Sequence, residues 1–367
     1  GERKGDDRPP SLGCILAHNM GLGKSLQTVA LLHTMLAHPA LVKKGATGKR
    51  KSPRIFSRAL LVVPVNTIAN WENEFRKWIG NLGSGGGIGG GGGRDAKRSQ
   101  EVPSVRFYNL NSVPSYHRSA MIAKWTATGG VLCTSSATFS PLCKPFLTTE
   151  GEGGGTDAAA AAERRRKVKS DPVYKALLNP GPDVIVLDEG HTMLKNSTTR
   201  IYKSLSAVKT SRRVVLTGTP LQNNLTEYFL MADWVSPGIL GTEAAFNAKF
   251  TGPIMDGMAR DSSADAIALH DARLTELHSV LSPFVHRRGA DVLRDDPSIP
   301  PMQQAVLHVR QSKMQVKLYR AFKLYKKRSD AGNNFFDQYQ KLRPVSNHPA
   351  TLLYTVRSRA ADEGVGG

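Results

Sequence analysis

Residues 14–25 read CILAHNMGLGKS, and the fold of the chain can be predicted outward from this stretch. The apolar run 14–17 is typical of a buried strand, and a helix-forming composition begins at Leu26. Between them lies the pentapeptide Gly21-Leu22-Gly23-Lys24-Ser25. A nucleoside triphosphate needs converging backbone N–H groups, a helix amino terminus, a lysine for its terminal phosphates and a hydroxyl for its metal ion. This strand-loop-helix segment can supply all four, so it predicts a phosphate loop.

The predicted phosphate loop departs from the full pattern at one position. That pattern begins with glycine five residues before Gly23, where this chain has His18. A Gly-Lys-Ser tripeptide by itself arises often by chance. The strand before it and the helix after it are what favour nucleotide binding here.

A second candidate site follows another apolar run. The strand-like residues Val184 to Leu187 lead directly into Asp188-Glu189-Gly190-His191. Two adjacent carboxylates at a strand end can divide the work, with Asp188 holding magnesium through its water shell and Glu189 orienting or deprotonating a water molecule. The alternative is a helix cap or a turn, which acidic residues commonly make. We expect this pair and Lys24 to meet at adjoining strand ends.

A third segment again follows an apolar run and is rich in small hydroxyl and amide side chains. It reads LTGTPLQNN over residues 216–224. Such side chains can sense phosphate, although an isolated segment of this kind is more often an ordinary polar turn.

Short apolar runs alternate with helix-like segments along the first 240 residues. Helical composition is found at Leu26 to Leu36 and at Trp71 to Trp78. This alternation predicts an α/β fold with a mostly parallel sheet that helices cover on both faces and with ligands at the carboxyl ends of the strands. The predicted strands are 14–17, 59–63, 105–108, 131–134, 183–187 and 214–217.

Two stretches within this region have a different composition. Gly83 to Gly93 is almost pure glycine, and Gly151 to Lys169 runs from glycine through alanine to basic residues. Both are expected to be flexible insertions, at about 80–100 and 150–170. After residue 240 the strand signals fade and amphipathic patterns such as Ala264 to Leu281 take over. We therefore expect a carboxyl-terminal helical appendage.

The composition favours a polyanionic partner. Lys and Arg number 50 against 30 Asp and Glu, and the formal net charge is +20. No apolar run of about 18 residues and no signal segment is found, so no membrane association is expected. The cysteines, Cys14, Cys133 and Cys143, show neither zinc-site spacing nor disulfide-scaffold density. Each is predicted to be a small buried apolar residue.

Taken in order, these motifs resemble the superfamily-two helicase core and, within it, the Swi/Snf-type remodelling ATPases. DEGH stands at the position of the DEAD or DExH motif, and LTGTPLQNN has the Swi/Snf form. Residues 64–71, PVNTIANW, resemble the family's DNA-contacting motif. Further details resemble the ATRX subgroup, namely residues 16–20 (LAHNM), 180–183 (PGPD), Phe250, Pro253-Ile254 and Gly257.

The resemblance implies a RecA-like first lobe of a nuclear, ATP-driven translocase that grips double-stranded DNA, with nucleosomes or histone-chaperone complexes as partners. It implies a lobe at 1–240, a helical protrusion at 241–345 and a linker toward a second lobe at 346–367. It also implies roles for individual residues. ATP would be bound by Met20, Gly21, Leu22, Gly23, Lys24, Ser25 and Leu26, Mg²⁺ by Ser25 and Asp188, and DNA by Pro64, Asn66, Thr67 and Asn70. Lys24, Asp188 and Glu189 would be catalytic, and His191, Thr217, Gly218, Thr219 and Gln222 would couple nucleotide state to DNA grip.

Departures from the family leave alternatives open. Residues 135–139 (SSATF) lack the usual tyrosine, and residues 287–292 (RRGADV) lack a lysine of the family motif. Neither the family's upstream adenine-reading motif nor its second lobe with arginine fingers is found in the sequence, so near-background hydrolysis is expected from this chain alone. One alternative is a catalytically silent DNA-binding scaffold, and another is an RNA-dependent DExH-type helicase. The basic run 164–169 is either a nuclear import signal or a solvated loop.

Overall fold

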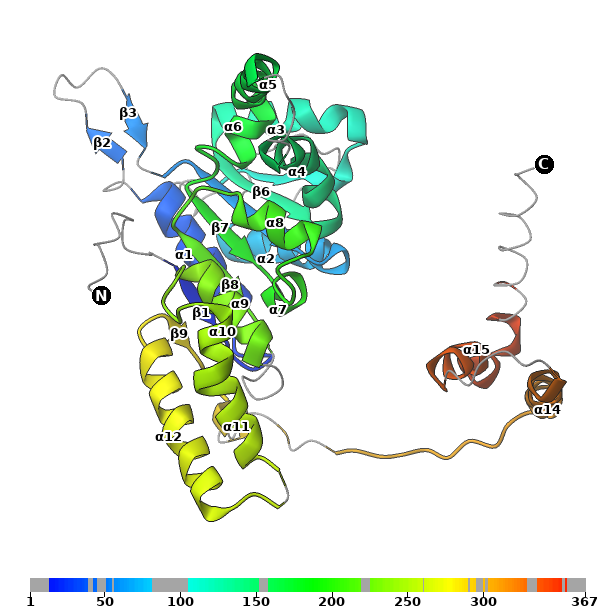
Figure 1. The fold of residues 1–367 in the computed structure, drawn as a ribbon. Helices are drawn as coiled ribbons and strands as arrows, with labels where there is room; N and C mark the ends of the chain where they lie inside the picture. The colour runs from blue at the N-terminus through cyan, green and yellow to red at the C-terminus, as the bar shows by residue number, and fades with distance from the viewer. Residues whose placement is uncertain are drawn as a thin grey trace. The chain divides into compact units, whose positions relative to one another are not determined.

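A computed structural model of the chain forms two compact units, residues 1–299 and 300–367, and each is described by itself (Figure 1). The structure describes residues 13–38, 42–44, 51–54, 56–80, 105–151, 158–218, 225–259, 261–289, 291–294, 300, 303–328, 335–351 and 354.

The first unit is built on a seven-stranded sheet in the order β5-β6-β4-β7-β8-β1-β9, and every neighbouring pair is parallel. This confirms the predicted α/β class. A separate antiparallel pair is formed by β2 (Val42–Lys44) and β3 (Lys51–Arg54). The strands of the large sheet are β1 (Cys14–Leu16), β4 (Arg58–Val63), β5 (Phe107–Asn109), β6 (Gly130–Ser135), β7 (Val184–Leu187), β8 (Arg213–Leu216) and β9 (Val285–His286).

Helices cover both faces of this sheet. Along β4, Leu60 and Val62 belong to one hydrophobic cluster and Leu61 and Val63 to the other, as the alternation of side chains in a strand requires. The second cluster is closed by α1 (Lys24–Ala37) and α2 (Ile68–Ile79). The first cluster is closed by α3 (Arg118–Thr128), α4 (Ser136–Gly151), α6 (Pro172–Leu177), α8 (Arg200–Ser206) and α9 (Leu225–Val235). Burial on both faces explains why the central strands have continuous apolar sequences.

A helical layer follows α9, as predicted. It consists of α10 (Glu243–Phe246), the π-helix η5 (Asn247–Thr251), α11 (Gly252–Gly257) and α12 (Ala264–Leu281). Gly257 lets α11 approach α12 closely, because a Cβ at that position would lie 2.4 Å from the His270 Cβ. The His270 Nδ1 lies 2.8 Å from the Ile254 carbonyl oxygen, which joins the two helices.

The second unit contains α14 (Lys313–Arg328) and α15 (Phe335–Asn347). The Gln315 side-chain amide donates to the carbonyl oxygens of Val345 and Ser346, at 3.2 and 2.9 Å, and so ties the two helices together. The remaining short elements are η2 (Val65–Thr67), η3 (Leu110–Ser112), η4 (Ser115–His117), α5 (Ala158–Ser170), α7 (Gly190–Met193) and α13 (Asp291–Arg294). No helix in the described part of the chain is both long enough and apolar enough to span a membrane.

Two sequence-based expectations were wrong. Residues 158–170, expected to be flexible, form helix α5, because alanine, glutamate, arginine and lysine all favour helix and Val168 packs against the core. Strands were not expected after residue 240, yet Val285–His286 pairs with β1 as β9. Two residues are too few for a periodic pattern. The glycine-rich stretch 83–93 lies outside the described residues, and the domain boundaries at 240 and 345 stay predictions.

The cysteines are not all buried, which corrects a third expectation. Cys133 and Cys143 are fully buried, but Cys14 is exposed at the first position of the short strand β1, one residue before the pairing of β1 with β9 begins. Burial raises the pKa of the Cys143 thiol to about 12 and also raises that of Cys133. Both buried thiols therefore stay protonated near neutral pH. Partial desolvation raises the pKa of Cys14 as well, so its thiol is set apart by its exposure to solvent.

This difference predicts the thiol chemistry of the folded chain. Only the thiolate reacts with disulfide reagents or alkylating agents. At pH 8 a chromogenic disulfide reagent is expected to modify one thiol per native chain and all three after denaturation. Replacing Cys14 with serine should abolish the native reaction. Rapid modification of more than one thiol in the native chain would contradict the burial of Cys133 and Cys143.

Candidate active site

The loop between β1 and α1 has the backbone shape that a phosphate loop requires. Gly21 and Gly23 have φ angles of 88° and 71°, in the left-handed region that favours glycine. Gly23 is the amino-terminal cap of α1, and no described side chain caps this helix. The first backbone N–H groups of a helix have no partner within it, so they suit an anionic ligand.

Lys24 is the first residue of α1, and its side chain reaches back to the loop. Its ammonium group donates to the carbonyl oxygens of His18 and Asn19, at 2.8 and 3.2 Å. Burial lowers the pKa of Lys24, and the nearby charges of Glu189 and Asp188 act in the opposite direction. The structure therefore brings the lysine of the first motif within electrostatic reach of the carboxylates of the second.

Asp188 is held in a defined orientation at the end of β7. Its backbone N–H donates to the Val62 carbonyl, and its carboxylate accepts hydrogen bonds from the Trp71 indole N–H at 2.7 Å and the Glu189 N–H at 3.0 Å. Trp71 was not predicted as a site residue. The sequence does contain a hint of this role. Trp71 lies on the apolar face of an amphipathic helix, and a buried indole needs a partner for its N–H.

A short polar chain leads from Glu189 to the end of β8. The Glu189 carboxylate lies 3.5 Å from His191 Nδ1, and the same nitrogen lies 3.0 Å from Thr217 Oγ1. Glu189 itself has a φ of 50°, which is rare for a residue with a side chain. Gly190 is required next to it, because a Cβ there would lie 2.4 Å from Val215 Cγ1. The DEGH turn is thus pressed tightly against β8.

Strand β1, which leads into the loop of Lys24, and strand β7, which leads into Asp188 and Glu189, are not hydrogen-bonded neighbours. This corrects the expectation that the two strand ends adjoin. β8 lies between β1 and β7 in the sheet. Its own end completes the cluster, since the Thr217 N–H donates to the Leu16 carbonyl at 3.1 Å. A Cβ on Gly218 would lie 3.8 Å from Lys24 Nζ and 3.5 Å from Met20 Cγ. We call Lys24, Asp188, Glu189, His191, Thr217 and Gly218 the three-strand cluster.

The remaining predicted site residues lie outside the three-strand cluster. Ser25 is half-buried in the first turn of α1, and Leu26 is exposed in the same turn. Thr219 and Gln222 lie outside the described residues. Residues 64–70 follow β4, which pairs with β7, so they lie at the same carboxyl edge as Asp188. Asn66 and Asn70 are exposed there, whereas the Thr67 hydroxyl donates to the Pro64 carbonyl at 2.9 Å.

The hydroxyl groups at the end of β6 are engaged with one another. The Asn111 side-chain amide donates to Ser135 Oγ at 2.9 Å and to Thr138 Oγ1 at 3.0 Å. Ser135 and Thr138 are also within hydrogen-bonding distance of each other. These side chains stabilise the local turn.

His18, the residue that departs from the usual phosphate-loop pattern, connects the loop to β9. Its ring is buried and meets the His286 ring edge-on at a centroid distance of 4.8 Å. The N–H groups of Ala17 and Asn19 donate to the carbonyl oxygens of His286 and Arg288, at 2.8 and 3.0 Å. The beginning of the phosphate loop is therefore anchored to the segment that follows α12.

A parallel sheet with a glycine-rich strand-loop-helix turn and a carboxylate pair at one edge is the architecture of phosphate-loop proteins. Comparison with known families narrows this class. The family described as "SNF2-related domain" matches residues 6–351. The chain belongs to the SNF2-related domain family.

Individual relatives agree with this assignment. Transcriptional regulator ATRX of Mus musculus is 34% identical over 354 residues, which cover 94% of this chain and 12% of that protein. Protein CHROMATIN REMODELING 20 of Arabidopsis thaliana is 34% identical over 347 residues, covering 92% of this chain and 20% of that protein. The chain thus spans at most about a fifth of the length of these two relatives. The predicted resemblance to the Swi/Snf-type ATPases and to the ATRX subgroup is confirmed.

A solved structure is also similar to this chain. It is the Sulfolobus solfataricus SWI2/SNF2 ATPase core in complex with dsDNA, with 20% sequence identity and a TM-score of 0.45. The match covers 96% of this chain and 61% of that chain.

The environment of His18 predicts a pH dependence of stability. Burial, together with the charges of His286, Lys24 and Arg288, lowers the pKa of His18 below its ordinary value of 6.5. Below about pH 6.5 the unfolded chain therefore binds a proton that the folded chain resists, and the free energy of unfolding falls as the pH falls. Urea denaturation at pH 7.5 and 5.5 should show this loss, and His18→Gln should reduce it.

The exposed histidine His117 offers a matched control. His117→Gln should leave the difference in unfolding free energy between the two pH values unchanged. An equal pH dependence in the wild type and in His18→Gln would contradict the assigned role of His18.

Proposed function

We propose that this chain is the first ATP-binding lobe of a DNA-dependent ATPase, which binds ATP with magnesium, holds the backbone of double-stranded DNA and couples hydrolysis to DNA movement. The observation that carries the proposal is the three-strand cluster. It places the phosphate-loop lysine, a carboxylate pair and a hydroxyl-bearing segment at one edge of the sheet.

The phosphate loop would bind the triphosphate of ATP. Met20 to Leu26 form the loop and the first turn of α1, where backbone N–H groups point out of the helix end. Lys24 now donates to carbonyl oxygens of its own loop. Exchanging these neutral acceptors for phosphate oxygens would give its partly desolvated charge a stronger partner.

The residues present fit a magnesium ion. Mg²⁺ in nucleotide sites is typically held by one or two protein groups together with substrate phosphates. Asp188 is a carboxylate whose two oxygens are each oriented by an N–H donor, and Ser25 offers a hydroxyl in the first turn of α1. We propose that these two residues hold the ion. Bound there, the ion would neutralise charge that develops on the terminal phosphates.

Glu189 would orient and deprotonate the attacking water molecule. Its left-handed backbone turns the residue away from the course of β7, and His191 lies beside its carboxylate. Because His191 also contacts Thr217, a change at Glu189 would reach the segment Thr217 to Gln222. We propose that His191, Thr217, Gly218, Thr219 and Gln222 report the state of the nucleotide in this way.

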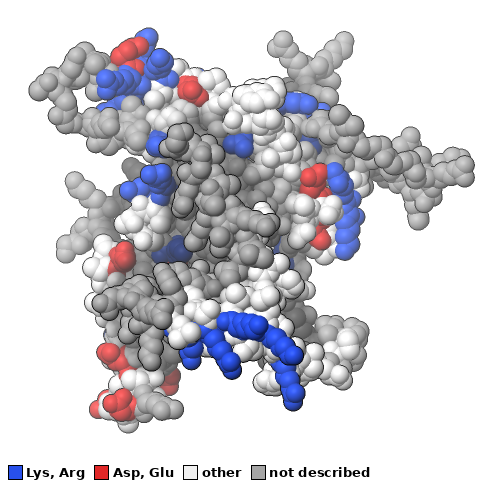
Figure 2. Space-filling view, turned by 90° about the vertical axis from the view of Figure 1, so that its right-hand side faces the viewer, with Lys and Arg blue, Asp and Glu red and all other residues white. Residues whose placement is uncertain are grey.

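DNA would be bound along the edge formed by residues 64–70. Asn66 and Asn70 are exposed there, and Trp71, the next residue, donates its indole N–H to Asp188. A shift of α2 on the DNA would therefore move a group that holds the magnesium ligand. Among the described residues on the face shown in Figure 2, Lys and Arg side chains stand in several separate groups, so the charge on this face does not mark one DNA track.

The wider setting is proposed from the relatives. The names of these two relatives contain "transcriptional regulator" and "chromatin remodeling". We propose that the whole protein acts in the nucleus on nucleosomes or with histone-chaperone complexes. We also propose that the 367-residue chain alone hydrolyses ATP near the background rate.

The nucleotide site can be tested with this chain. A fluorescent ATP analogue in the presence of Mg²⁺ should bind the wild type, and Lys24→Ala should weaken binding roughly 10- to 100-fold, the effect of losing one charge-assisted hydrogen-bond donor. Lys203→Ala removes an exposed lysine on α8 and serves as the matched control. Equal affinities of the wild type and Lys24→Ala would contradict the proposed nucleotide site.

Turnover should be measured in a longer chain that includes the second lobe implied by the family. DNA-stimulated hydrolysis that is lost in Glu189→Gln supports the enzyme over the silent scaffold. Stronger stimulation by duplex RNA than by duplex DNA would favour the RNA-dependent helicase.

The DNA edge has its own test. The double substitution Asn66→Ala/Asn70→Ala should weaken binding of duplex DNA about 3- to 10-fold at fixed salt, since it removes two neutral hydrogen-bonding side chains. The slope of affinity against salt concentration should stay the same, because that slope reports charged contacts. Asn179→Ala, at an exposed position that precedes β7, is the control at the opposite edge of the sheet. Unchanged affinity in the double variant would reject this edge as the DNA site.

A further inference from the structure

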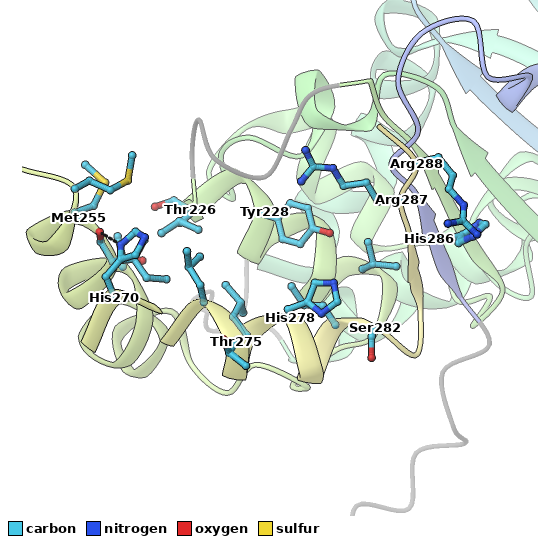
Figure 3. Close-up of a pocket in the computed structure, with 18 residues that line it drawn as sticks. Thr226, Tyr228, Met255, His270, Thr275, His278, Ser282, His286, Arg287 and Arg288 are labelled. Atoms are coloured by element: carbon cyan, nitrogen blue, oxygen red, sulfur yellow. Dashed lines mark hydrogen bonds between the residues drawn. The ribbon is translucent and has the colours of Figure 1, made fainter. Parts of the chain in front are cut away.

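A cavity of about 990 Å³ lies beside the sheet, lined by residues of α9, α11 and α12 and of the segment around β9 (Figure 3). Its volume is at the upper end of the range for small-molecule sites. None of the three-strand cluster residues lines it. The proposed nucleotide and DNA sites therefore do not account for this cavity.

The cavity wall has an apolar part and a polar part. Apolar side chains from α11 and α12, such as Ile254, Met255 and Leu277, form one part. The polar part contains the side chains of Arg287, His270 and His278 together with Thr and Ser hydroxyls. Arg288 and His286 belong to the same lining segment but point to the other side of β9 (Figure 3). No Asp or Glu is among the lining residues. Neither arginine forms an ion pair with a described carboxylate. An anionic group carried on an apolar body matches such a wall.

One side chain in this wall lacks the partner that its chemistry requires. Tyr228 of α9 is 3% exposed, and its hydroxyl has no hydrogen-bond partner among the described residues. A buried polar group of this kind is costly and rare in folded proteins. Figure 3 shows Tyr228 among the lining side chains, between Arg287 and His278 in this view. The hydroxyl and the Arg287 guanidinium together offer two donors to one acid group.

The cavity is connected to the phosphate loop through the backbone. The N–H groups of Ile15, Ala17 and Asn19 donate to the carbonyl oxygens of Phe284, His286 and Arg288, at 2.8, 2.8 and 3.0 Å. His286 and Arg288 belong to the segment that lines the cavity, but their side chains lie on the other side of β9 from Arg287 (Figure 3), and the His286 ring contacts the buried His18 ring there. A ligand held by this segment would therefore bear directly on the position of the loop.

We propose that this cavity is an effector site for a small amphipathic acid, meaning a carboxylate, sulfonate or phosphate on an apolar chain or ring. The acid group accepts hydrogen bonds from Tyr228 and Arg287, and the apolar body lies against α11 and α12. Occupation of the site shifts the nucleotide affinity of the phosphate loop, a consequence that rests on the proposed function.

The site is tested by titrating the 367-residue chain with 8-anilinonaphthalene-1-sulfonate, an aromatic sulfonate whose fluorescence rises in apolar surroundings. Saturable binding of one dye per chain is expected. Arg287→Gln should weaken it about 10-fold, as expected for a charge-assisted hydrogen bond, and Tyr228→Phe several-fold. Arg200→Gln, at an exposed arginine on α8, is the matched control. Unchanged affinity in both Arg287→Gln and Tyr228→Phe overturns the proposal, as does the absence of saturable binding.

Competition identifies the chemistry of the ligand. Decanoate should displace the dye, whereas inorganic phosphate at the same concentration should not, because it lacks an apolar body. Displacement by both to an equal extent overturns the amphipathic assignment. The neutral dye N-phenyl-1-naphthylamine should bind the wild type and Arg287→Gln equally, since it carries no acid group for the arginine to hold.

The coupling to the phosphate loop is measured separately, with a fluorescent ADP analogue and Mg²⁺. Saturating decanoate should change the affinity for this analogue at least about threefold in the wild type and leave it unchanged in Arg287→Gln. An unchanged affinity in the wild type overturns the effector role. If the analogue does not bind at all while the dye binds as expected, the proposed nucleotide function fails and the cavity site stands.

Discussion

The candidate active site depends on the register of three neighbouring parallel strands, β7, β8 and β1. Their carboxyl ends carry Asp188 and Glu189, Thr217 and Gly218, and the phosphate loop with Lys24. No local segment could assemble these groups, since they are far apart along the chain and only the sheet aligns them. The buried apolar residues that hold the strands in register therefore also position the polar cluster. Gly190 lets the DEGH turn lie directly against Val215 of the middle strand, which makes the alignment tight.

This alignment makes the polar groups depend on one another. Burial disfavours the charge on Lys24, and the neighbouring carboxylates favour it. Asp188 is oriented by Trp71 from α2, and Glu189 is linked through His191 to Thr217. Contacts thus run from the proposed DNA edge, through Trp71, to the proposed magnesium ligand and on to the end of β8. Groups connected in this way suit a site in which nucleotide state and DNA grip change together.

Much of this arrangement could be predicted from the sequence, because the central strands are buried on both faces and read as continuous apolar runs. Helix α12 was predicted with its observed ends, and the motif residues lie at strand ends as expected. Other features depend on tertiary contacts that no local pattern reports. The placement of β8 between β1 and β7, the two-residue strand β9 and the bond from Trp71 to Asp188 all belong to this group. Helix α5 was missed for another reason, since the glycine-rich sequence that precedes its alanine run is typical of a flexible segment.

The central claim is that Lys24 and the pair Asp188-Glu189 hold one nucleotide together. It is tested most directly by an experimental structure of this chain with Mg²⁺ and a non-hydrolysable ATP analogue. Lys24 Nζ is expected to lie about 3 Å from a terminal phosphate oxygen. Asp188 is expected to lie within about 4 to 5 Å of the metal ion, directly or through one water molecule. A triphosphate bound elsewhere, or one that contacts Lys24 while the metal ion lies far from Asp188, would contradict the claim.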